Sequence, residues 1–160
     1  YKAYQKWNKA QMFYNNKAYE AALEVYEPLY PLLKHKPEFL FEAAQSLSKT
    51  GRYEKANEYL ERAILLSSDP MLYYVMAKNE QCLGEYRQAE KHLLHAIDIL
   101  PERIYPYYLL MNLYTEPSYF QPAKLKMAID SVLTKKPKVE SSAIKEMKEK
   151  ARSMLNNTSI

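Results

Sequence analysis

Apolar residues recur at helical spacing along most of the chain. Within segment 37–69 they fall into two runs on either side of Gly51, and each run has the i, i+3/i+4 spacing of an amphipathic helix. Glycine tolerates the left-handed conformation that ends many helices, so we expect two helices joined by a turn at Gly51. The apolar positions are Leu40, Ala44 and Leu47 in the first run, then Ala56, Leu60, Ala63 and Ile64 in the second.

This arrangement returns every 33 or 34 residues. The stretch from Gly51 through Tyr53 to Ala56 is followed by Gly84-Glu85-Tyr86-Arg87-Gln88-Ala89 and preceded by Tyr19-Glu20-Ala21-Ala22. A period in this range is typical of helix-turn-helix repeats. In a fourth, divergent copy Phe120 takes the place of the turn tyrosine and Ala123 keeps the alanine. We therefore predict an all-α array over residues 1–137, with repeats at about 3–36, 37–69, 70–103 and 104–137.

Both ends of the array have the pattern of a cap. The first helix places Lys6 and Lys9 where the second repeat has apolar residues, which indicates that no earlier repeat packs there. A final amphipathic helix, with Ser141 or Ser142 as its N-cap, is predicted within 138–160 and is followed by a frayed tail.

Two prolines stand near the end of the second predicted helix, at Pro28 and Pro31. Proline has no N–H to donate and clashes with the preceding turn, so we expect these residues to shorten or kink that helix.

Charge and composition exclude some classes of function. The chain has only two glycines, and the whole net charge of +4 lies in residues 134–160, with a balanced body before them. A neutral body argues against a broad nucleic-acid surface. The basic tail is interpreted as a solvated helix face, and attraction to an anionic membrane or glycan is the alternative. No apolar run is long enough to span a membrane, and the start at Tyr1 indicates a piece of a longer protein.

The repeated Gly-x-Tyr-x-x-Ala phrases resemble the tetratricopeptide repeat (TPR) family over residues 3–137. The resemblance implies antiparallel helix pairs that stack into a right-handed α-solenoid. It also implies a concave groove lined by the first helix of each repeat, which commonly holds an extended peptide.

One column of this groove is aromatic in all four repeats. Two interpretations stay open: the rings pack between helices, or they form a platform for a peptide or a glycan while neighbouring amides supply hydrogen bonds. Members that grip chaperone C-termini carry lysine at this position, so that activity is not expected. The column is Trp7, Phe41, Tyr74 and Tyr108; one turn later stand Gln11, Gln45, Lys78 and Asn112, and one turn earlier Tyr4, Glu38, Met71 and Tyr105.

A narrower resemblance concerns segments 30–35, 104–110, 132–139 and 143–147. They are similar to the soluble C-terminal TPR segments of Bacteroides-type O-antigen ligase or polymerase membrane proteins. This implies a location at the periplasmic face of the inner membrane, on a membrane-embedded parent. The alternative is a stand-alone cytoplasmic TPR scaffold or chaperone-like adaptor.

Residues with catalytic potential are sparse. His92-x-x-His95-x-x-Asp98 shares one helix face, but this is the outer face of its repeat, so we interpret it as a solvated polar face rather than a metal site. Both glycines are used as repeat turns, which leaves no phosphate-binding loop. Glu38 is the only acidic residue placed in the groove, whereas a glycan hydrolase needs paired carboxylates. We expect a non-enzymatic interaction module without metal or cofactor, and a protein or peptide partner.

Overall fold

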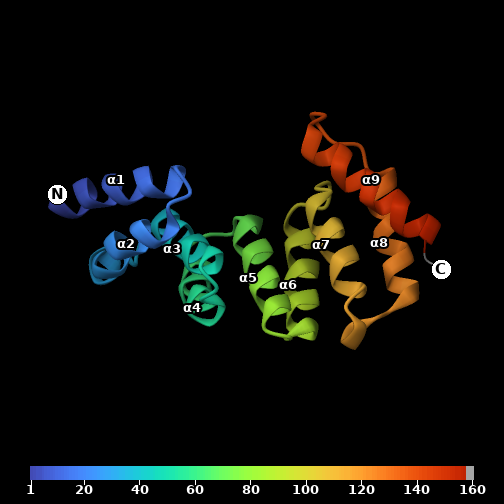
Figure 1. Ribbon diagram of the computed structural model, residues 1–160, viewed down its shortest axis with the longest axis horizontal. Helices are drawn as coiled ribbons and strands as arrows, with labels where there is room; N and C mark the ends of the chain where they lie inside the picture. The colour runs from blue at the N-terminus through green and yellow to red at the C-terminus, as the bar shows by residue number, and fades with distance from the viewer. Residues whose placement is uncertain (158–160) are drawn as a thin grey trace. The chain divides into compact units, whose positions relative to one another are not determined.

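The computed structural model describes residues 1–157, and this part of the chain is helical, without a strand. The helices fall into two compact units, Tyr1–Gly84 and the chain from Glu85 onward (Figure 1). Unit 1 holds α1 (Lys2–Asn15), α2 (Tyr19–Leu33), α3 (Pro37–Lys49), α4 (Tyr53–Ala63) and α5 (Pro70–Cys82). Unit 2 holds α6 (Tyr86–Ile99), α7 (Tyr105–Tyr114), the 3-10 helix η1 (Pro117–Tyr119), α8 (Pro122–Thr134) and α9 (Ser142–Asn157).

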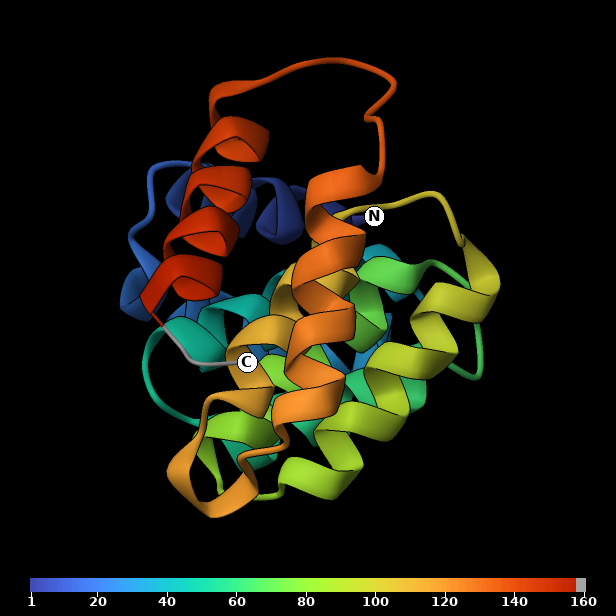
Figure 2. The same ribbon diagram turned by 90° about the vertical axis from the view of Figure 1, so that its right-hand side faces the viewer.

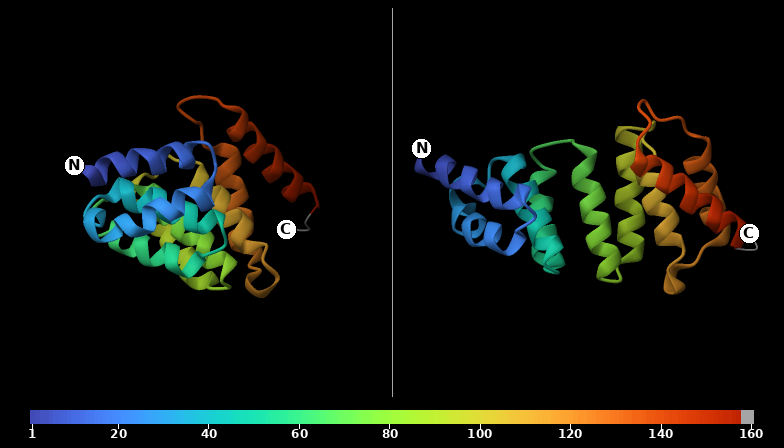
Figure 3. Two further views of the ribbon diagram at one scale, coloured as in Figure 1. Left: turned by 60° about the vertical axis from the view of Figure 1, so that its left-hand side comes forward. Right: turned by 45° about the horizontal axis from the view of Figure 1, so that its top comes forward.

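Helices that are neighbours in the sequence pack on one another in unit 1. Helix α1 lies against α2 and α3 against α4, while α2 contacts α3 and α4 contacts α5 (Figure 3). The predicted alanines lie at these contacts: Ala22, Ala44, Ala56 and Ala63 are fully buried. Their small side chains let helix backbones approach closely, and a larger residue would overpack the contact. The all-helical prediction and the core positions of the second repeat are confirmed, except that Ile64 is only half-buried.

The turns that start α2 and α4 share one backbone geometry. Gly51 has φ +83°, and Lys17, which occupies the same place one repeat earlier, has φ +60°. In both turns the next residue donates its N–H to a carbonyl five residues back, Ala18 to Phe13 and Arg52 to Leu47, each over 2.8 Å. This is the bond pattern of a Schellman C-cap, which requires one left-handed residue. The same backbone geometry therefore occurs in both turns, although only one of them has a glycine.

Helix α2 continues through both of its prolines. Its 15 residues end at Leu33, and Pro28 and Pro31 lie inside it with exposed side chains. The expectation that these prolines would shorten the helix is therefore wrong. Buried Tyr26, Leu29 and Leu33 hold the last turns against the core, and this burial offsets the loss of backbone hydrogen bonds.

The fourth repeat has a different register from the one that its sequence indicated. Ala123 is exposed, whereas Leu125 is fully buried, and Phe120 lies before α8 rather than at its start. The inter-helix connection contains η1, and α8 begins at Pro122, two residues beyond the expected turn position. Two residues turn a helix by about 200°, so the face that packs inward is another one. The prediction that Phe120 and Ala123 replace the tyrosine and alanine of the turn is wrong.

The last helix closes unit 2 as a cap. Figure 2 shows α9 beside α8, with the connection between them passing over one end of the pair. Ser141 Oγ accepts a hydrogen bond from the N–H of Ile144 at 3.2 Å, which makes it the N-cap, as one of the two predicted serines. The sequence predicts a tail that is frayed from Asn156, but Asn156 and Asn157 belong to α9, and residues 158–160 lie outside the described residues. None of the described helices is long and apolar enough to cross a membrane.

One lysine of α9 binds the end of α8. Lys148 Nζ donates to the carbonyl oxygens of Val132 at 2.8 Å, Leu133 at 3.3 Å and Lys135 at 2.9 Å. The last carbonyls of a helix lack partners within the helix and carry its negative dipole end, so a cation is favourable there. Lys148 therefore joins α9 to α8 through backbone groups, and its charge is engaged within unit 2.

Candidate functional site

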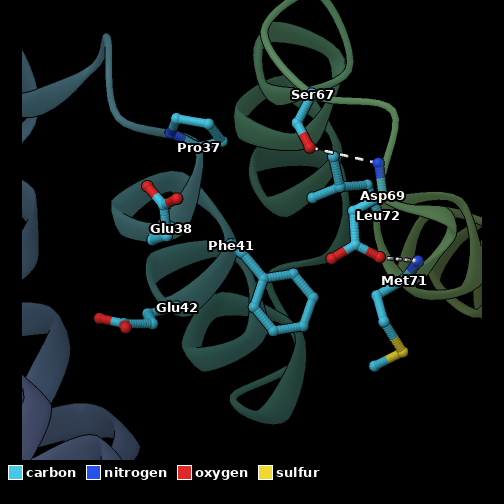
Figure 4. Close-up of a pocket in the computed structure, with 8 residues that line it drawn as sticks. All are labelled: Pro37, Glu38, Phe41, Glu42, Ser67, Asp69, Met71 and Leu72. Carbon is cyan, nitrogen blue, oxygen red and sulfur yellow. Dashed lines mark hydrogen bonds between the residues drawn. The ribbon is translucent and has the colours of Figure 1, made fainter.

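A pocket of about 270 Å³ opens in unit 1 between the first turns of α3 and the start of α5. We call it the Phe41 pocket. In Figure 4 the Phe41 ring faces Met71, and the carboxylates of Glu38 and Glu42 lie on the other side of the ring. Eight residues line the pocket: Pro37, Glu38, Phe41, Glu42, Ser67, Asp69, Met71 and Leu72.

Local sequence explains why these side chains meet. Proline in the first turn of α3 and of α5 starts each helix, since its missing N–H costs nothing there. Asp69 caps α5 by accepting the N–H of Met71 at 3.0 Å, and its own N–H donates to Ser67 Oγ at 3.2 Å. This capping holds the connection between α4 and α5 in place. Glu38 and Glu42 are four residues apart on α3, so they share its face with Phe41.

The Phe41 pocket is apolar inside and acidic at its border. Phe41, Leu72 and Pro37 supply apolar atoms, and the Met71 side chain is 42% exposed. Three carboxylates, from Glu38, Glu42 and Asp69, belong to the lining, and no lining residue is basic. A ligand that places an apolar group here therefore meets negative charge beside it.

Glu42 accepts hydrogen bonds from three side chains of α1 and α2. The Trp7 Nε1 group donates to Oε1 at 2.8 Å, Gln11 Nε2 to Oε2 at 3.0 Å and Tyr26 Oη to Oε1 at 2.9 Å. Burial, together with the neighbouring Glu42 carboxylate, raises the pKa of Tyr26 far above its ordinary value. Trp7 also packs edge-on against Phe39, with ring centroids 5.8 Å apart. Both Trp7 and Gln11 thus stabilise the packing of α1 on α3.

The other groove residues predicted in unit 1 lie in several environments. Tyr4 is exposed and tilted against Trp7, with centroids 5.9 Å apart. Tyr74 is only 4% exposed, so its ring belongs to the core. Gln45 is half-buried and Lys78 is exposed, and neither lines the Phe41 pocket. Of the predicted set, the structure brings Glu38, Phe41 and Met71 together in one pocket and joins Trp7 and Gln11 at Glu42, while Tyr4 contacts only the Trp7 ring among them.

In unit 2 two of the predicted residues, Tyr105 and Tyr108, lie near α9. Tyr105 and Tyr108 are stacked with ring centroids 6.4 Å apart, and Lys150 of α9 lies 5.5 Å from the centroid of Tyr108. Asn112 is half-buried, and its side-chain oxygen has no hydrogen-bond partner among the described residues. The Tyr108 ring is therefore covered by a cation of the capping helix.

A buried carboxylate, Glu90, organises unit 2. Glu90 is 8% exposed and accepts hydrogen bonds from Tyr114, Tyr119 and Lys124, the last at 2.9 Å. Burial by itself would raise the pKa of Glu90, but these three donors outweigh it, and the pKa lies below the ordinary value of 4.5. This cluster ties α6 to α7, η1 and α8.

Sequence reasoning missed Glu42, Asp69 and Glu90. Glu42 stands four residues after Glu38 on the same helix, a signal of a shared face that the sequence did contain. Asp69 directly before Pro70 is the pattern of an N-cap followed by a first-turn proline. Nothing local marks Glu90, because its three donors come from other helices.

His92 and His95, which the sequence places on one helix face, do not form a metal site with other side chains of the described residues. His92 is half-buried beside Gln88, with Nε2 atoms 3.5 Å apart, and His95 is exposed. Within residues 1–157 no group of three or more His, Cys, Asp or Glu side chains could hold a metal ion.

Comparison with known families places this fold. The sequence profile of the family described as "Anaphase-promoting complex, cyclosome, subunit 3" matches residues 15–96, just over half of the chain. The chain belongs to this family. The matched part of this TPR-like family member runs from the end of α1 into α6 and includes all residues of the Phe41 pocket. A search of curated proteins gives no match.

Solved structures confirm the TPR-like fold of this family member. MamA (residues 41 to the end) from Desulfovibrio magneticus RS-1 is 19% identical with a TM-score of 0.75, over 99% of this chain and 98% of that one. YrrB, described as a TPR protein with an unusual peptide-binding site, is 14% identical with a TM-score of 0.68, over 96% and 78%. SycD of Yersinia enterocolitica, in complex with a peptide of the translocator YopD, is 16% identical with a TM-score of 0.56, over 94% and 92%.

Proposed function

We propose that this chain is a non-catalytic interaction module that binds a short peptide segment of a partner protein in the Phe41 pocket. The observation that carries this proposal is the pocket itself: an aromatic ring and Met71 on the first helices of two successive repeats, on the face where the repeat pattern placed a groove. Two proteins of the same fold, SycD and YrrB, are described with a bound peptide or a peptide-binding site.

The lining defines the chemistry of the peptide. An apolar side chain that enters the pocket contacts Phe41, Met71 and Leu72. Glu38 and Asp69 at the border favour a Lys or Arg next to that side chain, since complementary charge adds specificity and speeds association. A neutral glycan could stack on Phe41 and donate hydroxyl hydrogen bonds to these carboxylates, but it would lack the attraction between opposite charges. We therefore assign as the ligand a peptide in which an apolar residue stands next to Lys or Arg. Binding of a glycan instead is one possible result of the test.

A displayed library of random heptapeptides, selected on the whole chain, tests the proposal. We expect enriched sequences to pair a large apolar residue with Lys or Arg, and their binding, measured by fluorescence anisotropy, to weaken with added salt. Phe41→Ala and Met71→Ala should each weaken binding about fivefold or more, as residues at the centre of a binding site do.

Leu94→Ala is the matched control, because Leu94 is a similarly exposed apolar residue in unit 2. It should leave peptide affinity unchanged. If no peptide is enriched, or if enriched peptides bind the Met71→Ala variant as tightly as the unaltered chain, the pocket is not the site. Binding of neutral oligosaccharides that depends on Phe41 would instead assign the pocket to a glycan.

As its cellular context we propose the periplasmic face of the inner membrane, where the chain would form the C-terminal part of an O-antigen ligase or polymerase. This proposal rests on the resemblance of segments 104–110 and 132–139, and the alternative is a stand-alone cytoplasmic adaptor. The genomic sequence upstream of the codon for Tyr1 tests it. A run of encoded membrane spans in the same reading frame supports the first context, and a start codon without spans supports the second.

A further inference from the structure

We propose that unit 2 contains a separate ligand site, which binds a single-chain amphiphile with an anionic head, of the fatty-acid class. The site is a pocket of about 520 Å³ between the start of α7, the connection from α8 to α9 and the first turns of α9. We call it the Ile144 pocket. Its volume lies within the range of about 300–1,000 Å³ found for small-molecule sites.

The interior of the Ile144 pocket is apolar. Ile104 is buried at its base, and Ile144 and Met147 of α9 are half-buried around it. Val139, on the connection, is 76% exposed and lies in the lining. An exposed valine beside half-buried aliphatic residues leaves apolar surface in water, and an alkyl chain in the pocket would cover it. Leu100 and Tyr105 complete this surface.

The border of the pocket is basic. Arg103, Lys136 and Lys138 line it, and Glu102 is the one acidic residue among the lining side chains. All four are exposed, and none of the three cations has an ion-pair partner among residues 1–157. A carboxylate held here remains hydrated, so it gains attraction without a large desolvation cost. The first turn of α9 also lines the pocket and adds the positive end of its helix dipole.

This arrangement assigns a role to five of the seven basic residues within 134–160. Lys148 binds the end of α8, Lys135 lies 5.0 Å from the ring centroid of Tyr107, and Lys150 covers Tyr108. These three lysines are engaged in packing. Lys136 and Lys138 are instead placed at the border of an apolar pocket, where charge and hydrophobic surface together match an amphipathic anion.

Isothermal titration calorimetry with sodium octanoate and sodium decanoate, each below its micellar concentration, tests the proposal on the whole chain. We expect one decanoate per chain, and octanoate to bind more weakly by about fourfold for each missing methylene. Decyltrimethylammonium and decanol have the same chain with a cationic or neutral head, and they should bind at least tenfold more weakly.

Variants locate the site. The charge reversal K136E/K138E should weaken decanoate binding at least fivefold, whereas K91E/K126E makes the same change in net charge at exposed lysines outside the pocket and should not. Val139→Asp should weaken binding more than Val139→Lys, which removes the same apolar group but keeps the attraction. Val139 is exposed, so neither variant endangers folding.

Three results would overturn the proposal. They are no binding of decanoate, equal binding of the cationic or neutral amphiphile, and binding that K136E/K138E leaves unchanged. If the chain does not bind decanoate but co-sediments with anionic vesicles, the lysines are assigned to a membrane surface instead.

Discussion

The Trp7 indole donates a hydrogen bond to Glu42 over 2.8 Å and so links α1 to α3. The indole N–H of half-buried Trp7 finds its partner in Glu42, which also accepts from Gln11 and Tyr26. The first aromatic residue of the repeat column is therefore committed to packing. Phe41, one position before Glu42, carries no polar group and remains open to the pocket.

Glu42 should be important for stability in unit 1. Glu42→Ala leaves three donors without their acceptor, and we expect the free energy of unfolding to fall by about 2–4 kcal/mol. Glu42→Gln keeps one acceptor oxygen and should cost less. Urea unfolding followed by circular dichroism measures both variants. Glu61→Ala, at an exposed position of α4, is the control and should change stability by less than about 0.5 kcal/mol. If Glu42→Ala loses no more stability than Glu61→Ala, Glu42 does not have this role.

The buried pair Asn57 and Asn79 should show energetic coupling. Asn79 Nδ2 donates to Asn57 Oδ1 at 2.8 Å, and Asn57 Nδ2 donates to the carbonyl of Met76 at 3.3 Å. Either single change to Ala leaves a buried amide without its partner. We therefore expect the double variant to cost about 1 kcal/mol less than the two single variants together, measured by a double-mutant cycle in urea. Strict additivity would show that the two amides do not depend on each other.

The shared turn geometry predicts opposite effects at two equivalent positions. Lys17→Gly should raise the free energy of unfolding by about 0.5–1 kcal/mol, because a left-handed lysine is strained and glycine is not. Gly51→Ala should lower it by about 1 kcal/mol. A Cβ at Gly51 would meet no atom within 4 Å, so its cost comes from the backbone alone. Thermal and urea unfolding check the two signs, and destabilisation by Lys17→Gly would contradict this explanation.

Glu90 should make stability dependent on acidic pH. Its pKa in the folded chain lies below the ordinary 4.5, so the folded state binds fewer protons than the unfolded state as the pH falls past that value. The stabilisation is present above about pH 4.5 and is lost as the pH drops through the lower, folded pKa. Glu90→Gln should remove this part of the pH dependence. Urea midpoints between about pH 6 and 3 measure it.

Tyr119→Phe provides an intermediate case for the same experiment. It removes one of the three donors to Glu90 and should weaken the acid dependence without abolishing it. If the unaltered chain and Glu90→Gln lose stability in parallel on acidification, the hydrogen bonds to Glu90 do not favour its ionised form.

The sequence predicted those features that depend on neighbours along the chain. Helix periodicity and the turns placed α1 to α6 and the buried alanines, because a turn and a stripe are local patterns. The repeat period gave the wrong position for Ala123, because η1 lengthens the connection before α8. The conformation of that connection depends on Pro117 and on the burial of Leu125. The repeat period correctly placed Phe41 at a pocket, but it did not predict that Tyr74 is buried or that Trp7 is bonded to Glu42. Whether a ring on a helix face is covered is decided by residues of other helices, such as Glu42.

The prolines of α2 limit where a partner can bind. Without N–H groups at Pro28 and Pro31, the carbonyls of Glu24 and Glu27 have no donor four residues ahead, and all four residues are exposed. Water can serve these acceptors at the surface. A protein pressed onto that side of α2 would have to replace the water with its own donors or lose affinity. The outer side of α2 is therefore unfavourable for the binding of another protein.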